Sequence, residues 1–281
     1  MEKFIEDGKA ICDLYGFIEE PRPIMLPRAP QQTYIDVFHN VGEPGNNFRD
    51  DRTRQLNYET EVKLNRSLER LDEPIMVLHG FQFTHHHYRL LDQKHVRKGC
   101  TTCRKNPKKR EGECDFIVMG KGYILVIEVK DMSNIGHVTA CEDDFHLCVL
   151  GEGTQEPGCN RENQVRALAG SFYKSVKQRK KIVDVIKCIE EVTNIFQFTA
   201  YPNFSKRFQK EFPVLPEQLS TILFKEDVDD LSVWWKEFLA PKLFGHSCDE
   251  KAVYGANHER VKKILLAVWC AEENICNFFQ V

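Results

Sequence analysis

The alternation of apolar and polar positions predicts strands at the centre of this chain, with helices on either side. Residues 58–71 carry leucines at helical spacing, and residues 74–83 have the apolar composition of a strand. Two apolar runs, at 114–119 and 123–130, flank a Gly-Lys-Gly turn. Apolar runs joined by a short glycine-containing turn predict a β-hairpin.

The second half of the chain also combines strands and helices. Residues 136–151 predict two short strands, residues 160–192 a long helix and residues 195–202 another strand. Two amphipathic patterns, at 227–244 and 257–279, predict carboxy-terminal helices. This order of elements predicts an α/β fold in which helices flank a mixed central β-sheet.

Three segments are expected along the chain. Residues 1–54 are expected to form an N-terminal extension, in which a short helix precedes a proline-rich stretch that favours extended or irregular structure. Residues 55–245 are expected to form the main domain, interrupted by a basic, cysteine-containing insertion at 92–112. Residues 246–281 are expected to form a C-terminal helical segment.

Composition narrows the functional classes. Hydrophobic residues make up 42% of the 281 positions, which is enough to fill a core. The eleven cysteines and the lack of a signal-peptide pattern predict an intracellular protein with reduced thiols, in the nucleus or the cytoplasm. No apolar run reaches the length of a membrane span, so no membrane association is expected.

Three charged residues, Asp115, Glu128 and Lys130, lie at the ends of the two apolar runs of the predicted hairpin. Because strand side chains alternate, Glu128 and Lys130 share one face, and Asp115 can lie across the hairpin from them. Two carboxylates brought together repel unless a divalent cation lies between them. The arrangement predicts an Mg²⁺ or Mn²⁺ site, with Lys130 orienting or deprotonating the attacking water or neutralising charge on a phosphate. The alternative is a surface ion pair between Glu128 and Lys130 on an edge strand.

The flanking helices add two candidate residues to this site. Glu61 lies three residues before Leu64 and projects from the apolar stripe, where an unpaired carboxylate is costly. Glu59 competes for the same role but fits the leucine stripe poorly. Gln164 lies near the start of the predicted long helix.

These motifs resemble those of the PD-(D/E)xK nuclease superfamily, and more narrowly its nuclease-related-domain (NERD) branch. The resemblance runs from about residue 58 to residue 240. It includes the Glu-bearing first helix, the strands GECDFIV, KGYILVIEVK and GHVTA, and the helix start NRENQV. The sequence departs from the family pattern at residues 160 and 161, where Asn-Arg replaces Asn-Pro.

The resemblance implies a restriction-endonuclease-like core and metal-dependent phosphodiester cleavage. By position, it implies that Asp115 and Glu128 are metal ligands and that Lys130 is the catalytic lysine. It implies that Glu61 is a further ligand or water-binding acid, and that Gln164 orients a group or contacts substrate. All the expected carboxylates and the lysine are present, which favours an active enzyme.

Cys100 and Cys103 form a C-x2-C pair inside the basic insertion, with His95 upstream. This spacing suits one tetrahedral structural Zn²⁺. His95, a histidine of residues 85–87 or the distant HSC at 246–248 would supply the other ligands. The alternative is two free thiols in a loop.

Two basic stretches are expected to contact the backbone of a nucleic acid. Eight Lys or Arg residues lie between Lys94 and Arg110, and six between Lys174 and Lys187. The expected contacts are Lys98, Arg104, Lys105, Lys108, Lys109, Arg110, Lys177, Lys180 and Lys181. Few aromatic residues are interleaved with them, so backbone recognition with limited sequence specificity is expected. The family resemblance favours DNA over RNA.

Two functions are therefore expected to compete. The first is a metal-dependent nuclease, and the alternative is a non-catalytic nucleic-acid-binding or scaffold module that uses the same fold and its basic loop. The tryptophans Trp234, Trp235 and Trp269 are expected to anchor the C-terminal helices in a core or an interface. The apolar helix at 257–279 is expected to dock on the domain, on a protein partner or on a second copy.

Overall fold

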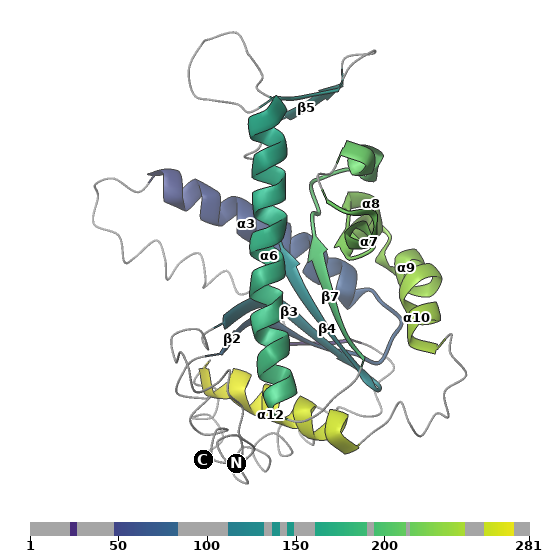
Figure 1. Cartoon of the computed structure of the whole chain (residues 1–281). Coiled ribbons are helices and arrows are strands. Elements are labelled where there is room, and N and C mark those ends of the chain that lie inside the picture. The colour runs from purple at the N-terminus through teal and green to yellow at the C-terminus, as the bar shows by residue number, and fades with distance from the viewer. Residues whose placement is uncertain are drawn as a thin grey trace.

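The structure is a computed structural model with a six-stranded mixed sheet and helices on both of its faces (Figure 1). The residues that it describes are 23–26, 48–83, 112–131, 137–140, 145–148, 161–189, 194–211, 214–244 and 256–272. A separate antiparallel pair is formed by β5 (His137–Ala140) and β6 (Phe145–Cys148). The predicted α/β fold with a mixed central sheet is confirmed.

The order of strands across the main sheet combines both directions of pairing. From one edge to the other the strands are β1 (Ile24–Leu26), β2 (Met76–Phe83), β3 (Gly112–Gly120), β4 (Tyr123–Val129), β7 (Ile195–Ala200) and β8 (Ile222–Leu223). The neighbours β2, β3 and β4 are antiparallel, whereas β1 is parallel to β2, and β7 and β8 continue parallel to β4. The predicted hairpin is therefore β3–β4.

Helices from distant parts of the chain bury the sheet on both faces. On one face, α6 (Arg161–Ile189) and α12 (Ala256–Glu272) pack against apolar side chains of β2, β3 and β4. On the other face lie α3 (Phe48–Glu69) and the short helices α8 (Lys225–Asp229), α9 (Leu231–Trp234) and α10 (Ala240–Phe244). Figure 1 shows α6 and α3 on opposite sides of the strands. Every residue of β4 is buried, which explains its unbroken apolar run.

Part of the expected N-terminal extension belongs to this arrangement. Helix α3 begins at Phe48, ahead of the leucine pattern that predicted it, so the boundary expected at residues 54 and 55 falls inside a helix. Strand β1 lies in the proline-rich stretch and pairs with β2. The domain boundaries themselves stay a prediction.

The single helix expected at 227–244 is a series of short helices. Asp230 ends α8, and its side chain accepts a hydrogen bond from the Val233 N–H at the start of α9. A π-helical turn, η4 (Trp235–Leu239), then precedes α10. In a straight helix, the side chains of adjacent residues point in different directions. In this series of short helices, by contrast, the adjacent side chains of Trp234 and Trp235 are both buried in the same core cluster.

Two short helices and one strand in the same region were not predicted. The 3-10 helix η3 (Lys206–Glu211) and the helix α7 (Pro216–Leu219) precede β8. Helix α12 anchors on the sheet of its own chain through Trp269, whose Nε1 donates to the His79 carbonyl at 3.0 Å. No helix among the described residues is both long and apolar enough to cross a bilayer.

The alternation of side chains breaks where β2 and β3 cross the site. Leu78 and Phe81 face the same core layer although they are three residues apart. Gly80 lies between them with φ +68°, a left-handed conformation that glycine adopts at little cost. On β3, Cys114 and Phe116 face opposite layers although they are two residues apart. Asp115 therefore lies at the point where the strand changes face.

Replacing Gly80 by alanine should destabilise the fold through backbone conformation alone. An added Cβ at Gly80 meets no atom within 4 Å, so the cost is that of holding an L-residue at positive φ, about 1–2 kcal/mol. Gly170→Ala in α6 also meets no atom within 4 Å and should stabilise by about 0.5–1 kcal/mol. Urea denaturation measures both changes. Shifts of the same sign in the two variants would contradict this account of Gly80.

Candidate active site

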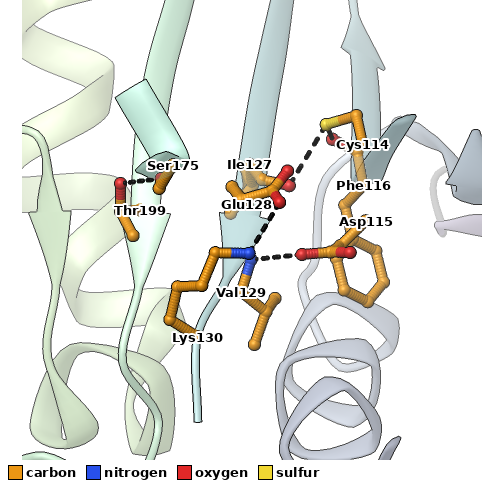
Figure 2. A network of polar contacts seen from close by, with 9 residues as sticks. All are labelled: Cys114, Asp115, Phe116, Ile127, Glu128, Val129, Lys130, Ser175 and Thr199. Atoms are coloured by element: carbon orange, nitrogen blue, oxygen red, sulfur yellow. Dashed lines mark hydrogen bonds and ion pairs between the residues drawn. The ribbon is translucent and has the colours of Figure 1, made fainter. Parts of the chain in front are cut away.

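The candidate site lies where the two strands of the β3–β4 hairpin separate. Their backbones are paired as far as Phe116↔Ile127, after which β3 continues beside β2 and β4 beside β7. Side chains of β3 then bond to the backbone of β4 (Figure 2). Asp115 Oδ2 accepts from the Val129 N–H at 2.6 Å, and Cys114 Sγ donates to the Ile127 carbonyl at 3.4 Å.

Glu128 is a buried carboxylate near the end of β4, with 2% of its surface exposed. Its Oε1 accepts a hydrogen bond from Lys130 Nζ at 2.7 Å, as expected for side chains two residues apart on one face (Figure 2). Its Oε2 is buried and has no hydrogen-bond partner among the residues that the structure describes. A buried polar atom without a partner costs about 1–3 kcal/mol, and more when it is charged. A ligand on this oxygen would remove that cost.

The alternative of a surface ion pair on an edge strand is wrong. Strand β4 lies between β3 and β7, so it is not an edge strand. The Glu128 side chain is 3% exposed, whereas that of Lys130 is 24% exposed. The pair therefore joins a buried acid to a cation that reaches solvent.

Burial dominates the electrostatics of the site, and repulsion between the acids adds to its effect on Asp115. Withdrawal from solvent, the Glu128 carboxylate and then the Glu61 carboxylate raise the pKa of Asp115 well above its usual value. Burial also raises the pKa of Glu128, although Lys130 opposes that rise. Burial lowers the pKa of Lys130, but Glu128 and Asp115 outweigh it, so the net shift is upward. The folded protein binds extra protons at the two carboxyls, so its stability without metal falls as the pH rises through their raised pKa values.

Glu61 projects from α3 toward β2. Its Oε2 lies 2.8 Å from His79 Nε2, and the His79 ring packs on Phe116 with 4.7 Å between ring centroids. Glu59, the competing glutamate, is exposed. Sequence reasoning did not select His79, whose only signal was a polar residue within a mostly apolar strand. The structure thus gives Glu61 a direct partner and places its charge near Asp115.

A buried polar layer lies on the α6 side of Glu128. Thr199 of β7 is paired with Glu128 in the sheet. Its hydroxyl is hydrogen-bonded to that of Ser175 on α6, with 2.6 Å between the two oxygens (Figure 2). Arg179, one turn further along α6, is 2% exposed, and burial lowers its pKa to about 10. Arg179 belongs to the basic stretch that was expected to face a nucleic acid. It is instead buried beside the acids, where its charge opposes the rise in the pKa of Glu128.

The other expected site residues fall into two groups. Lys177 and Lys180 are exposed on α6 and Lys181 is partly buried there, whereas the Gln164 side chain lies outside the described residues although its backbone is in α6. The candidate zinc ligands and the basic insertion also lie outside the described residues. They are Cys100, Cys103, His95, Lys98, Arg104, Lys105, Lys108, Lys109 and Arg110.

The acid pair fits a hard divalent cation. Within the described ranges, no three or more His, Cys, Asp or Glu side chains are grouped as a set of metal ligands. Mg²⁺ needs only one or two carboxylates because it keeps several of its waters. Asp115 and Glu128 supply two carboxylates that interact electrostatically, and no described residue hydrogen-bonds Glu128 Oε2. The third carboxylate, that of Glu61, is hydrogen-bonded to the His79 ring.

The mixed sheet thus carries a buried acid pair and an adjacent lysine at its central hairpin. The family model of the nuclease-related domain (NERD) matches residues 56–193. These residues are therefore a nuclease-related domain, with a restriction-endonuclease-like fold, and the resemblance seen in the sequence is confirmed. Comparison with curated proteins and with solved structures found no match.

Asp115→Asn should raise the melting temperature of the metal-free protein at neutral pH. The amide keeps an oxygen for the Val129 N–H and removes the charge that repels Glu128. A gain of about 1 kcal/mol corresponds to about 2–4 °C for a chain of this size. Mg²⁺ or Mn²⁺ should stabilise the wild type and have little effect on the variant, because a ligand stabilises the state that binds it. Differential scanning fluorimetry measures both effects.

Asp184→Asn is the matched control, because Asp184 is an exposed acid on α6. Its melting temperature without metal should stay close to that of the wild type, and its response to cations should be unchanged. A wild-type melting temperature that neither cation changes would contradict the assignment. So would an Asp115→Asn variant with the full response.

Proposed function

We propose that this protein is a metal-dependent nuclease that hydrolyses phosphodiester bonds, with DNA as the expected substrate. The family match supports a nuclease-related function for residues 56–193. The single observation that carries the proposal is the buried Oε2 of Glu128, which has no partner in the described part of the chain and lies beside Asp115 and Lys130. Unsatisfied buried charges in a folded protein mark sites where a ligand or a reaction supplies the missing interaction.

Asp115 and Glu128 would hold Mg²⁺ or Mn²⁺ between them. When bound, such a cation polarises a phosphoryl oxygen and lowers the pKa of a coordinated water. The chain's own contribution is to fix the two carboxylates before substrate arrives. Asp115 is held by the Val129 N–H, and Glu128 by Lys130, so neither carboxylate must reorganise on binding.

Lys130 would act on the phosphate or on the attacking water. An ammonium group has three donors, and one of them goes to Glu128, which leaves two for other oxygens. Its partial exposure lets it reach a bound substrate from the rim of the site. From this position it can orient the water and neutralise negative charge that develops in the transition state.

The substrate would be held through its backbone. Lys177 and Lys180 are exposed on α6, whose face toward the sheet carries the buried Arg179 and Ser175. Cations on a solvated helix contact phosphates and carry little sequence information. Limited sequence preference is therefore expected, and the basic insertion at 92–112 would add further contacts.

Glu128→Gln and Lys130→Met should each lower the cleavage rate by about 10²–10³ or more, as expected when one charged group is removed from a transition-state site. The assay uses purified protein with labelled single- and double-stranded DNA and RNA, in Mg²⁺, in Mn²⁺ and in EDTA. Cleavage is expected with either metal and none in EDTA. The same assay shows which nucleic acid is preferred.

Lys206→Met is the matched control. Lys206 also pairs with a carboxylate, Asp227, at 2.8 Å, but this pair lies outside the site. Its variant should cleave at the wild-type rate. Binding of nucleic acid without cleavage under every metal condition would favour the non-catalytic binding module instead. Full activity of Lys130→Met would remove Lys130 from the mechanism.

A further inference from the structure

Asn203 joins three segments beside the candidate site. It follows β7, which pairs in parallel with β4. Beyond the end of β4, the Lys130 N–H still donates a hydrogen bond to the Ala200 carbonyl of β7, at 2.9 Å. The Asn203 amide nitrogen donates to Thr60 Oγ1 and to Asp131 Oδ1, at 3.0 Å each. Its amide oxygen accepts from Lys63 Nζ.

These partners lie within two residues of the site residues along the chain. Thr60 and Lys63 are on α3, on either side of Glu61, and Asp131 follows Lys130. Asn203 therefore connects the helix that carries Glu61 with the strand end that carries Glu128 and Lys130. Thr60 is fully buried, so this end of the connection is fixed.

Lys63 keeps its positive charge available for another partner. Other lysines, among them Lys130 and Lys206, are paired with carboxylates. Within the part of the chain that the structure describes, no carboxylate lies within ion-pair distance of the Lys63 ammonium, and its hydrogen bond goes to a neutral amide oxygen. An amide holds the cation in place without neutralising it. Lys63 is also exposed.

We infer that Asn203 is a positioning residue that holds Lys63 as a phosphate-contacting cation at the rim of the site. The inference rests on the proposed function, and it names the backbone phosphates of the substrate as the group that Lys63 binds. The amide is needed because it offers both donors and an acceptor. Its donors hold Asp131 and Thr60, and its oxygen holds Lys63. Without the Asn203 amide, Lys63 would pair with Asp131. The Lys63 charge would then no longer be available to bind the substrate.

The test measures binding of a fluorescent DNA duplex in EDTA by anisotropy, across a range of salt concentrations. Each phosphate contact contributes about 0.9 to the slope of log affinity against log salt. Lys63→Gln and Asn203→Ala should each lower the magnitude of this slope by the contribution of one phosphate contact, about 0.9. The double variant should lose no more than either single variant, because both changes remove the same contact.

Rescue distinguishes positioning from a purely structural role. Adding Asp131→Asn to Asn203→Ala removes the acid that would capture Lys63, so the slope should return to that of the Asp131→Asn variant alone. Lys121→Gln, in the β3–β4 turn at the opposite end of the strands, is the control and should leave the slope unchanged. Urea denaturation should show that the variants at the exposed Lys63 and Asn203 remain folded.

Three outcomes overturn the inference. They are an unchanged slope in Lys63→Gln, an unchanged slope in Asn203→Ala, and a failure of Asp131→Asn to restore the slope. The same binding data are obtained without metal and without cleavage. A protein that binds DNA through Lys63 but never cleaves it would therefore refute the nuclease proposal and leave this inference standing.

Discussion

Two carboxylates held together where a hairpin opens are the constraint on which the site depends. The Glu128 carboxylate helps to raise the pKa of Asp115, and among the described residues only one oxygen of Glu128 has a hydrogen-bonding partner. Replacing buried charged groups by well-packed apolar side chains often leaves a protein equally or more stable. Under the proposed function, a fold that keeps such a pair in its central strands exchanges stability for the capacity to bind a cation.

The surrounding fold makes this arrangement rigid. Strand β4 is buried along its whole length and lies between two hydrogen-bonded neighbours, so Glu128 has little freedom to move away from Asp115. The change of face at Gly80 and Asp115 turns the Asp115 carboxylate to the Val129 N–H. Helices α3 and α6 then close the two sides, and they contribute Glu61 and Arg179. Positions fixed by strands and helices are more exact than positions on loops.

The sequence predicted those features that depend on local periodicity. The β3–β4 hairpin, the long helix α6 and the contact between Glu128 and Lys130 follow from spacing within one segment. Features that depend on distant pairing were not predictable in the same way. The break at Gly80 depends on how β2 pairs with β3, and the Asn203 contacts join residues 140 and 143 positions apart.

Helix orientation set another limit on prediction. Cations crowd one stretch of α6, and their spacing alone did not show that Arg179 faces the sheet while Lys177 and Lys180 face solvent. Strand β1 has only three residues, too few for a periodic signal. The zinc site and the basic insertion lie outside the described residues and stay predictions.

Anomalous diffraction from crystals of the protein grown with Mn²⁺ tests the central claim most directly. The account predicts a peak about 2 Å from carboxylate oxygens of both Asp115 and Glu128, and its disappearance in crystals of Glu128→Gln. A map with no peak between these two side chains, under conditions in which the crystalline protein cleaves DNA, would contradict it.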